Sequence, residues 1–318
     1  MALDTAPAVT VVIPTHDRLA LLEETLRSVA EQHPRTAVVV VDDGSTDGTA
    51  EAIAGRTGIE LVHNPEGRWG SGRARNAGLG LVTTPYVAFV DSDDLLVPGA
   101  LGAMSRALDA APSAPFAFGR ALAAARTDGG WAPEGLIAPL PAERAALGPA
   151  IFARNMVPSS GALVRTQAAR LVGGYDTDLV FSEDHDFWLR LAALGEPVHI
   201  PRLVLVHRRH VGNRHMPARA RKDDDAIGAR AAQLPAFAST EPARAGIQLC
   251  EEGLDALRAR RPGELAAVAR RLLGGRRDPA GVVLAAGRHA RRRRAARRAG
   301  QALWEHDTGL RDWLAGYR

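Results

Sequence analysis

Residues 37–49 read Ala-Val-Val-Val-Val-Asp-Asp-Gly-Ser-Thr-Asp-Gly-Thr, so five apolar residues run directly into a crowded acidic turn. Apolar β-branched runs without alternation are typical of strands that are buried on both faces of a parallel sheet. Gly44 allows a tight backbone turn after the strand, and Thr46 or Asp47 can cap a helix over 48–55. The stretch therefore predicts a strand, an acidic turn and a helix.

The same alternation continues on both sides of this stretch. Apolar spacing predicts strands at 8–13, 59–63 and 86–90, and helices at 19–32, 71–80 and 98–110. Strands and helices that alternate over short links are typical of a mostly parallel sheet with helices on both faces. We therefore expect an α/β, Rossmann-like fold.

Acidic side chains follow three of these predicted strands. Because ligands bind such sheets beyond the carboxyl ends of the strands, the acids are expected at the functional edge. Carboxylates at i and i+2 can converge on one hard cation, which prefers oxygen ligands; a turn with helix-capping aspartates is the alternative explanation. The acids in question are Asp17, then Asp42 and Asp43, then Asp91, Asp93 and Asp94.

The pattern changes after residue 110. The Ala/Pro/Gly-rich region 111–150 predicts a variable loop region with one strand at 116–121. Strand-then-helix character resumes at 161–172, followed by a helix at 183–194 and a strand at 198–206. From about 217 onward Ala, Arg and Leu predominate, which predicts a helical, Arg-rich C-terminal region over 216–318 after a domain over 1–215.

Seven motifs in this chain together resemble the family 2 glycosyltransferases, the inverting group with the GT-A fold. The resemblance covers about residues 8–215 and implies nucleotide-sugar binding over about 8–110, with the acceptor side and the base over 111–215. His207 departs from the family pattern, because relatives usually have an aromatic residue there. The motifs are Pro14-Thr15-His16-Asp17-Arg18, Val41-Asp42-Asp43-Gly44-Ser45, 70–78, 91–94, Gly173-Gly174-Tyr175-Asp176, 182–190 and His207-Arg208-Arg209-His210.

The resemblance implies that the acidic turn holds the base and ribose of a sugar nucleotide. A carboxylate accepts hydrogen bonds from a uracil N–H or from ribose hydroxyls. A glycine-rich turn that enters a helix favours anions, and arginine pairs with phosphate; a packing turn with surface arginines is the alternative. The candidate donor-binding residues are Pro14, Thr15, Asp17, Asp42, Asp43, Arg73, Arg75, Asn76, Asp91 and Ser92.

The resemblance also implies a metal ion and a general base. Mn²⁺ or Mg²⁺ is expected beside the diphosphate, and its candidate ligands are Asp91, Asp93, Asp94 and His210. An inverting transfer needs a base for the acceptor proton, and this role falls to Asp184, with Glu183 beside it to orient the acceptor. The alternative is a pair of acids that the helix macrodipole favours at a helix N-terminus.

The expected activity is thus sugar transfer of the hexosyltransferase type, from a nucleotide donor, with a UDP-sugar expected first, to an acceptor nucleophile. A small molecule, a lipid-linked sugar, a glycan and a peptide all remain open as acceptor. A nucleotidyltransferase on a related fold would carry a glycine-rich Arg/Lys triphosphate loop, and 14–18 is not one. A non-catalytic sugar-nucleotide-binding protein would lack acids at the metal or base positions, and here all are present.

Composition and charge bear on partners and compartment. The formal net charge is +4, and Cys250 is the single cysteine, so no intrachain disulfide can form and a reducing compartment is expected. No apolar run approaches the ~18 residues of a transmembrane helix, which predicts a cytoplasmic protein. The basic run 288–298 is a solvated face, a contact with an anionic membrane at its inner face, or an oligomer contact. No nucleic-acid partner is expected, because no binding module is visible.

Overall fold

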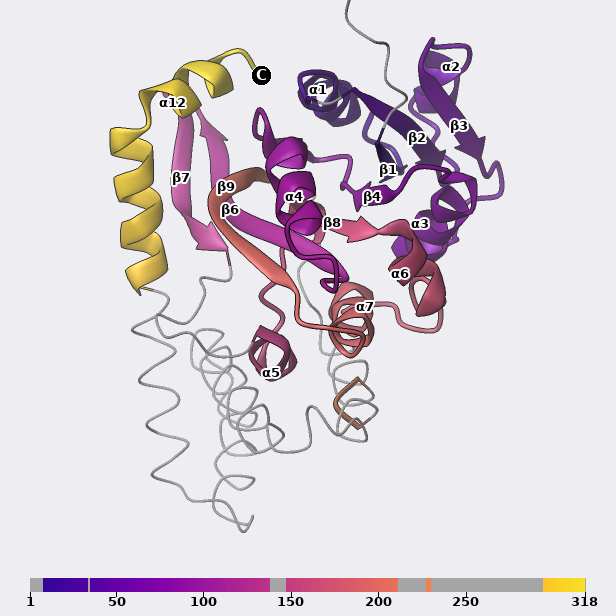
Figure 1. The fold of residues 1–318 in the computed structure, drawn as a ribbon. Coiled ribbons are helices and arrows are strands. Elements are labelled where there is room, and N and C mark those ends of the chain that lie inside the picture. The colour runs from indigo at the N-terminus through magenta and orange to yellow at the C-terminus, as the bar shows by residue number, and fades with distance from the viewer. Residues whose placement is uncertain (1–7, 34, 138–146, 211–226, 230–293, 318) are drawn as a thin grey trace, which may run out of the picture.

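The computed structural model describes residues 8–33, 35–137, 147–210, 227–229 and 294–317. Within them, a nine-stranded sheet has the order β3-β2-β1-β4-β8-β6-β9-β5, with β7 paired to β6 (Figure 1). The strands are β1 (Val9–Thr15), β2 (Thr36–Asp42), β3 (Ile59–His63), β4 (Tyr86–Phe89), β5 (Asp94–Leu96), β6 (Phe116–Thr127), β7 (Gly130–Ile137), β8 (Ala162–Arg165) and β9 (Val198–Arg209).

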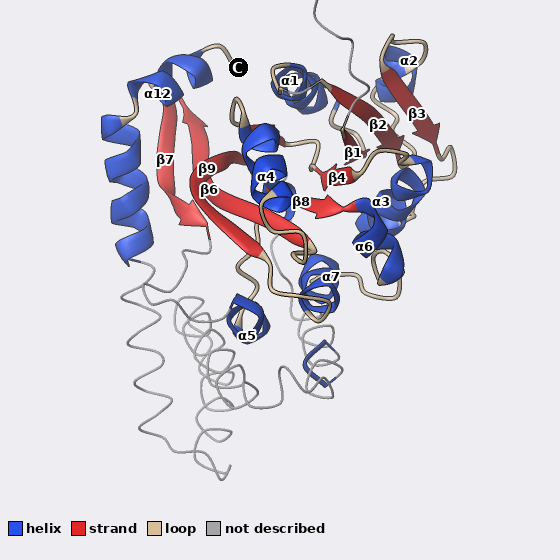
Figure 2. Ribbon diagram, viewed as in Figure 1, coloured by secondary structure: helices blue, strands red, loops and turns tan. Residues whose placement is uncertain are grey.

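Helices pack on both faces of this sheet (Figure 2). They are α1 (Leu19–Ala30), α2 (Thr49–Ile53), α3 (Gly70–Leu81), α4 (Ala100–Asp109), α5 (Leu147–Ala153), the 3₁₀ turn η1 (Ser159–Gly161), α6 (Thr166–Leu171), α7 (Glu183–Ala192) and α12 (Thr308–Ala315). A further helix at 294–306 precedes α12. The α/β fold and the predicted order of strands and helices up to residue 110 are confirmed.

The sheet divides into two halves of different character. β1 pairs in parallel with β2 and β4, and β2 pairs in parallel with β3, as expected for apolar strands joined by helices. Beyond β4 the sheet is mixed, because β8 runs antiparallel to both β4 and β6 while β9 runs parallel to β6. The expectation of a mostly parallel sheet therefore holds for the first half only.

The region 111–150 was wrongly expected to be mainly loop. The described part of it contains the long strand β6 and the strand β7, joined as a hairpin through Asp128 and Gly129. β6 is rich in alanine, a residue with low β-propensity, so it lacks the usual β-branched signal. Ala121, Leu122 and Ala124 are nevertheless buried, because helices cover the sheet here. The Asp-Gly pair, a common hairpin turn, is the signal from which a second strand could have been predicted.

Two apolar layers hold the helices to the sheet. One face packs Val12 and Phe89 against α3, α5, α6 and α7, with Phe187 and Trp188 fully buried. The other face packs alternate residues of the same strands, such as Val11, against α1, α2 and α4. Alternate residues of one strand are therefore buried on opposite faces, which explains why the strands lack polar alternation.

The C-terminal helices close the far end of the sheet. Leu310, Leu314 and Tyr317 share an apolar cluster with Leu95 of β5, Leu122 of β6 and Val206 of β9, and Figure 1 shows these helices beside β7. The indole of Trp313 donates a hydrogen bond of 2.7 Å to Glu31 at the end of α1. The C-terminal segment thus completes a core of the preceding domain.

Several predictions for the C-terminal region lie outside the described residues, namely the domain boundary at 215/216, Cys250 and the basic run up to 293. In the described part, Arg294, Arg297 and Arg298 are exposed on the helix at 294–306, and membrane or oligomer contact there stays a prediction. No helix among the described residues is both long enough and apolar enough to cross a membrane.

Candidate active site

The loop after β1 is joined to the loop after β2 through Asp17. Its carboxylate Oδ1 accepts hydrogen bonds from the Thr46 backbone N–H at 2.6 Å and from the Thr46 hydroxyl at 3.2 Å. Its own N–H donates to Ser45 Oγ at 2.9 Å, and the residue has a positive φ of 49°. The Thr46 N–H lowers the pKa of Asp17. The exposed Asp17 therefore stabilises the loop pair, and its predicted donor contact remains a prediction.

Asp42 is fully buried at the end of β2, and both of its oxygens are engaged. Oδ1 accepts hydrogen bonds from the backbone N–H and the hydroxyl of Ser45, and Oδ2 lies 2.8 Å from His63 Nδ1. Gly44 follows in a left-handed conformation with φ of 78°, and an added Cβ there would stand 2.7 Å from the Cα of Gly67. The acidic turn is thus packed closely against the loop before α3.

Asp43 fixes the start of α3. Its Oδ1 accepts hydrogen bonds from Asn64 Nδ2 at 2.8 Å and from the Trp69 N–H at 3.0 Å, and its Oδ2 accepts one from the Gly70 N–H at 2.9 Å. These are contacts within the protein, of the helix-capping kind that the sequence left open as an alternative. A role for Asp42 or Asp43 in holding the nucleoside stays a prediction.

The Pro14-Thr15 turn places a polar group, the Thr15 hydroxyl, beside the end of β2. Thr15 pairs in register with Asp42 and is 4% exposed. Among the described residues its hydroxyl has no hydrogen-bond partner. A buried hydroxyl without a partner is unfavourable by roughly 1–3 kcal/mol, so a ligand that bonds to it would remove that penalty.

The acids after β4 converge as predicted. Asp91, Asp93 and Asp94 each place a carboxylate oxygen within 4.8 Å of the others. The side chain of Asp91 is 32% exposed, whereas Asp93 and Asp94 are buried. Hard divalent cations bind such groups of carboxylate oxygens. The three side chains therefore fit a Mg²⁺ or Mn²⁺ ion.

Asp93 and Asp94 differ in their protein partners. Asp93 Oδ2 pairs with Arg18 at 2.7 Å and lies 2.9 Å from Nε2 of His210, the predicted histidine ligand. Asp94 uses both oxygens, one 2.8 Å from His207 Nδ1 and the other accepting from the Ser160 hydroxyl at 2.6 Å. Burial acts to raise the pKa of Asp94, but His207 and Ser160 outweigh it and hold that pKa below normal. Asp94 is thus the acid most engaged by the protein.

Ser92 lies between these acids and is buried. Its carbonyl oxygen accepts a hydrogen bond of 2.9 Å from the Thr25 hydroxyl of α1. The structure therefore places the Ser92 backbone against α1, and the predicted donor contact of Ser92 remains a prediction.

Arg75 connects the acidic cluster to α7. Its buried guanidinium donates to Asp91 at 2.6 Å and to Glu183 Oε1 at 2.8 Å, and it lies over the Tyr175 ring at 5.1 Å. Burial acts to lower the pKa of Arg75, but Asp91, Tyr175 and Glu183 raise it well above normal. Arg75 is therefore a fixed cation between the predicted diphosphate site and the predicted base.

The other two residues predicted on α3 lie differently. Asn76 forms two hydrogen bonds of 2.8 Å with the backbone N–H and C=O of Tyr175, so it fixes the 174–175 turn. Arg73 is exposed. Of the three residues, Arg75 therefore lies in the site, Asn76 holds the turn beside it, and Arg73 lies on the surface.

The two acids that begin α7 have pKa values shifted in opposite directions. Burial, followed by the Glu183 charge, raises the pKa of Asp184 to about 6. Burial also acts to raise the pKa of Glu183, but Arg75 and Ser71 outweigh it and leave that pKa below normal. Neighbouring carboxyls with separated pKa values are typical of acid–base sites. Asp184 is the member of the pair suited to accept a proton near neutral pH.

Three residues contact this site although they were not predicted from the sequence. Asn155 donates to Asp184 Oδ2 at 3.1 Å, and its own side-chain oxygen is buried without a partner among the described residues. Ser160 donates to Asp94 and accepts from the Asp91 N–H, and Thr25 contacts the backbone of the acidic loop. Asn155 lies in a stretch without periodicity, whereas the sequence Pro158-Ser159-Ser160 carried a turn signal.

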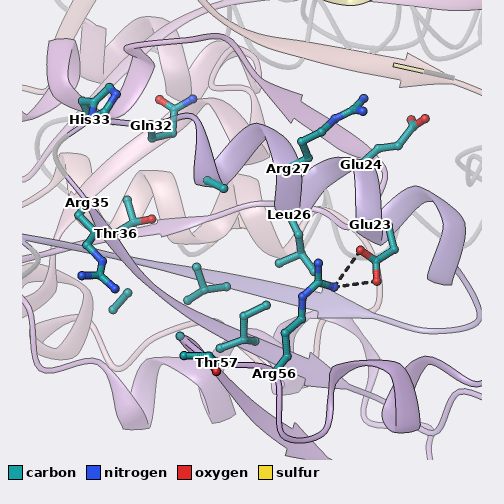
Figure 3. A pocket seen from close by; sticks show the side chains of 15 residues that line it. Glu23, Glu24, Leu26, Arg27, Gln32, His33, Arg35, Thr36, Arg56 and Thr57 are labelled. Atoms are coloured by element: carbon teal, nitrogen blue, oxygen red, sulfur yellow. Dashed lines mark hydrogen bonds and ion pairs between the residues drawn. The ribbon is translucent and has the colours of Figure 1, made fainter. Parts of the chain in front are cut away.

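A hollow of about 1190 Å³ lies elsewhere, between α1 and the starts of β2 and β3 (Figure 3). Arg27, Arg35 and Arg56 line it together with Glu23, which pairs with Arg56 at 2.7 Å. None of the predicted donor, metal or base residues lines this hollow. We therefore place the candidate active site at the acidic edge of the sheet.

Comparison with known proteins shows which family this chain resembles. Residues 10–141 match the model of Glycosyl transferase family 2. The chain is 32% identical over 224 residues to uncharacterized protein MT1568 of Mycobacterium tuberculosis (strain CDC 1551 / Oshkosh), covering 64% of this chain and 67% of that protein. It is 39% identical over 92 residues to the putative teichuronic acid biosynthesis glycosyltransferase TuaG of Bacillus subtilis (strain 168), which is 28% of this chain and 36% of that protein. The second match therefore spans little more than a third of that relative.

Solved structures share the fold. S. aureus TarS 1-349 in complex with UDP-GlcNAc superposes with a TM-score of 0.59 at 20% identity over 74% of this chain and 69% of that chain. The mannosyltransferase PcManGT from Pyrobaculum calidifontis in complex with GDP-Man and Mn²⁺ gives a TM-score of 0.57 at 22% identity over 96% of this chain and 89% of that chain. At these identities the likeness concerns the fold, and it matches the expected GT-A class.

Proposed function

Since the chain belongs to glycosyl transferase family 2, a family of sugar-transferring enzymes, we propose that it moves a sugar from a nucleotide donor to an acceptor nucleophile with inversion. The observation that carries this proposal is the placement of Asp91, Arg75, Glu183 and Asp184 in one connected group at the carboxyl edge of the sheet. That group combines acids for a cation, a fixed positive charge and a carboxyl of raised pKa. The donor proposed first is a UDP-sugar, which the complex of TarS with UDP-GlcNAc supports.

The diphosphate of the donor is proposed to lie beside Asp91 and Asp93. Asp91 offers a partly exposed carboxylate, and Asp93 shares its Oδ2 between Arg18 and His210. When bound, Mn²⁺ or Mg²⁺ would offset the charge that develops on the departing nucleoside diphosphate. The Mn²⁺ in the PcManGT complex supports this choice of cation. Arg75, charged at any working pH, would supply further positive charge next to Asp91.

Asp184 is proposed as the general base. Its ionised carboxylate takes the proton from the acceptor hydroxyl while the acceptor oxygen forms a bond to the anomeric carbon. The bond from that carbon to the diphosphate oxygen breaks at the opposite side, so the configuration inverts. With a pKa of about 6, Asp184 is mainly ionised near neutral pH and is still a stronger base than an ordinary aspartate. Asn155 and the His185 N–H hold the carboxylate in place.

Thermal unfolding with a panel of UDP-, dTDP- and GDP-sugars, each with and without Mn²⁺, tests the proposal. A ligand that binds only the folded protein raises the melting temperature by mass action. We expect a Mn²⁺-dependent rise in melting temperature with one nucleotide class, which would also identify the nucleobase of the donor. A folded protein that responds to none of these donors would contradict the transferase proposal. The anomeric configuration of the product, read by proton NMR, would then test inversion.

For the acceptor, the proposal specifies only that it is a nucleophile. Asp184 lies at the start of α7 and accepts a hydrogen bond from Asn155, which follows α5. Small molecules, lipid-linked sugars, glycans and peptides are the acceptors to be offered once the donor is known.

A further inference from the structure

The end of β9 holds the acidic loop 91–94 residue by residue. His207 bonds to the Asp94 side chain and His210 to the Asp93 side chain. Between them, Arg208 turns inward and bonds to the backbone of the loop. The loop is thus held by two histidines through its side chains and by one arginine through its carbonyl groups.

Arg208 is buried and donates hydrogen bonds both to this loop and to α1. Its side chain is 3% exposed. Nε donates to the Asp93 carbonyl at 2.5 Å, and one terminal nitrogen donates to the Ser92 carbonyl at 3.4 Å and to the Leu21 carbonyl at 2.8 Å. The guanidinium therefore fixes two consecutive peptide units of the loop against the first turns of α1.

Two side chains of α1 complete this arrangement. Glu24 accepts a hydrogen bond from the other terminal nitrogen of Arg208 and supplies its counter-charge. Thr25 accepts from Arg208 at 2.9 Å, and its hydroxyl lies 2.9 Å from the carbonyl oxygens of both Ser92 and Asp94. A buried arginine with a paired carboxylate and several carbonyl acceptors is satisfied at every nitrogen, so its geometry is fixed.

We propose that Arg208 is a positioning residue, which, together with Glu24 and Thr25, sets the backbone of the 91–94 loop so that the Asp91 and Asp93 carboxylates converge on a divalent cation. The inference rests on the proposed function, because it assigns the support of the proposed metal site. The hydrogen bonds from Arg208 to the loop end on backbone carbonyl oxygens, so they act on the loop conformation. Second-layer partners that orient metal-binding carboxylates typically change metal affinity by about 10- to 100-fold.

Lysine cannot replace this arginine. Arg208 donates in three directions from a planar fork, to the loop, to Glu24 and to Thr25. An ammonium group keeps the charge but lacks the fork, so it cannot reach the two carbonyl groups and Glu24 together. Arg208→Lys therefore separates geometry from charge. Arg209→Lys is the matched control, because the neighbouring Arg209 is exposed and pairs with Glu134 at 3.4 Å on the surface.

The experiment combines two measurements on the purified full chain. Hydrogen–deuterium exchange of the metal-free protein reports the loop amides, and electron paramagnetic resonance reports the binding of Mn²⁺ alone and with UDP. We expect Arg208→Lys to speed exchange in the peptide over 91–94, with remote peptides unchanged, and to weaken Mn²⁺ binding about tenfold or more. Arg209→Lys should stay within about twofold of the wild type, since exposed ion pairs contribute little.

A second pair of variants keeps the proposal testable if Arg208→Lys fails to fold. Thr25→Val removes the hydroxyl at constant shape and should show the same loop-specific effect, whereas Thr25→Ser should restore wild-type exchange and binding. Unchanged loop exchange and Mn²⁺ affinity in folded Arg208→Lys, or in Thr25→Val, would overturn the role of Arg208. A wild-type protein that binds no Mn²⁺, with or without UDP, would instead overturn the metal part of the proposed function, and the exchange measurement would still decide the role of Arg208.

Discussion

Replacement of Asp184 by asparagine should abolish transfer and at the same time stabilise the folded protein near neutral pH. Folding raises the pKa of this carboxyl from 3.8 to about 6. A shift of about two units corresponds to roughly 3 kcal/mol of unfavourable free energy for the ionised group, an upper bound for a half-buried side chain. Asparagine carries no charge but keeps the shape. It loses one good hydrogen bond, worth about 1 kcal/mol, at Asn155 or at the His185 N–H.

The net gain should therefore be about 1–2 kcal/mol, which corresponds to a rise of roughly 2–8 °C in melting temperature for a domain of this size. The sign depends on pH. Because the folded-state pKa is raised, the contribution of Asp184 to the free energy of unfolding of the wild type is highest below the unfolded pKa and falls as pH rises through about 6. The stability gain of Asp184→Asn over the wild type should accordingly be present at about pH 8 and be lost near pH 4, where the wild-type carboxyl is protonated in the folded protein.

Urea unfolding at several pH values, beside donor-turnover assays, would measure both effects. Glu183→Gln is the contrasting neighbour, because Arg75 holds the pKa of Glu183 below normal and the ionised form contributes to stability. Glu183→Gln should therefore destabilise the protein above the unfolded pKa of glutamate, opposite to Asp184→Asn. Wild-type turnover in Asp184→Asn would refute the base assignment. A loss of stability at about pH 8 in Asp184→Asn would refute the burial argument.

Three further outcomes are expected. Asp93→Asn should lower Mn²⁺ affinity about tenfold or more while leaving the fold intact, and an unchanged Mn²⁺ titration would count against Asp93 as a ligand. Gly44→Ala should destabilise by more than about 1 kcal/mol in urea unfolding, since the position has a φ of 78° and a backbone atom of Gly67 within 2.7 Å; an unchanged midpoint would show that the turn relaxes. Leu314→Ala should destabilise by about 2–5 kcal/mol, because Leu314 is fully buried, and a loss under about 1 kcal/mol would mean that α12 docks weakly.

The first half of the fold was predictable because its strands carry a strong signal. Val38–Val41 and 86–90 are continuous apolar runs, and helices with clear apolar spacing separate them. The strand β6 could not be predicted over its full length, since alanine at 121 and 123–125 has low β-propensity, and the burial of Ala121 and Ala124 comes from distant helices. The short strand β5 begins at Asp94, within the acidic motif, and forms only because β9 lies beside it.

The sequence was enough to predict which acidic residues gather at the site. It was not enough to predict which residues those acids contact. Strand ends place Asp91, Asp93 and Asp94 at one edge whatever the rest of the chain does. The contacts of Arg75 with Glu183 and of Asn155 with Asp184 join residues 108 and 29 positions apart. Such pairs depend on how α3, α5 and α7 pack on the sheet, which no local pattern encodes. The contacts of Arg208 could not be predicted either, because Arg208 lies in a basic segment at the end of a strand and nothing local indicates that it is buried.

The docking of α12 has a consequence for the way the chain folds. The hydrogen bond from Trp313 to Glu31 joins residues 282 positions apart, and the bond from Arg27 to the Gly316 carbonyl spans 289 positions. At synthesis rates of about 5–20 residues per second, α1 therefore waits roughly 15 seconds to a minute for the segment that bonds to it. Leu95, Leu122 and Val206 are made within that interval, and from then until it ends they lack the leucines and tyrosine that later bury them. The nascent chain thus passes through a stage with an open apolar edge, when a chaperone can bind it or a second nascent chain can pair with it.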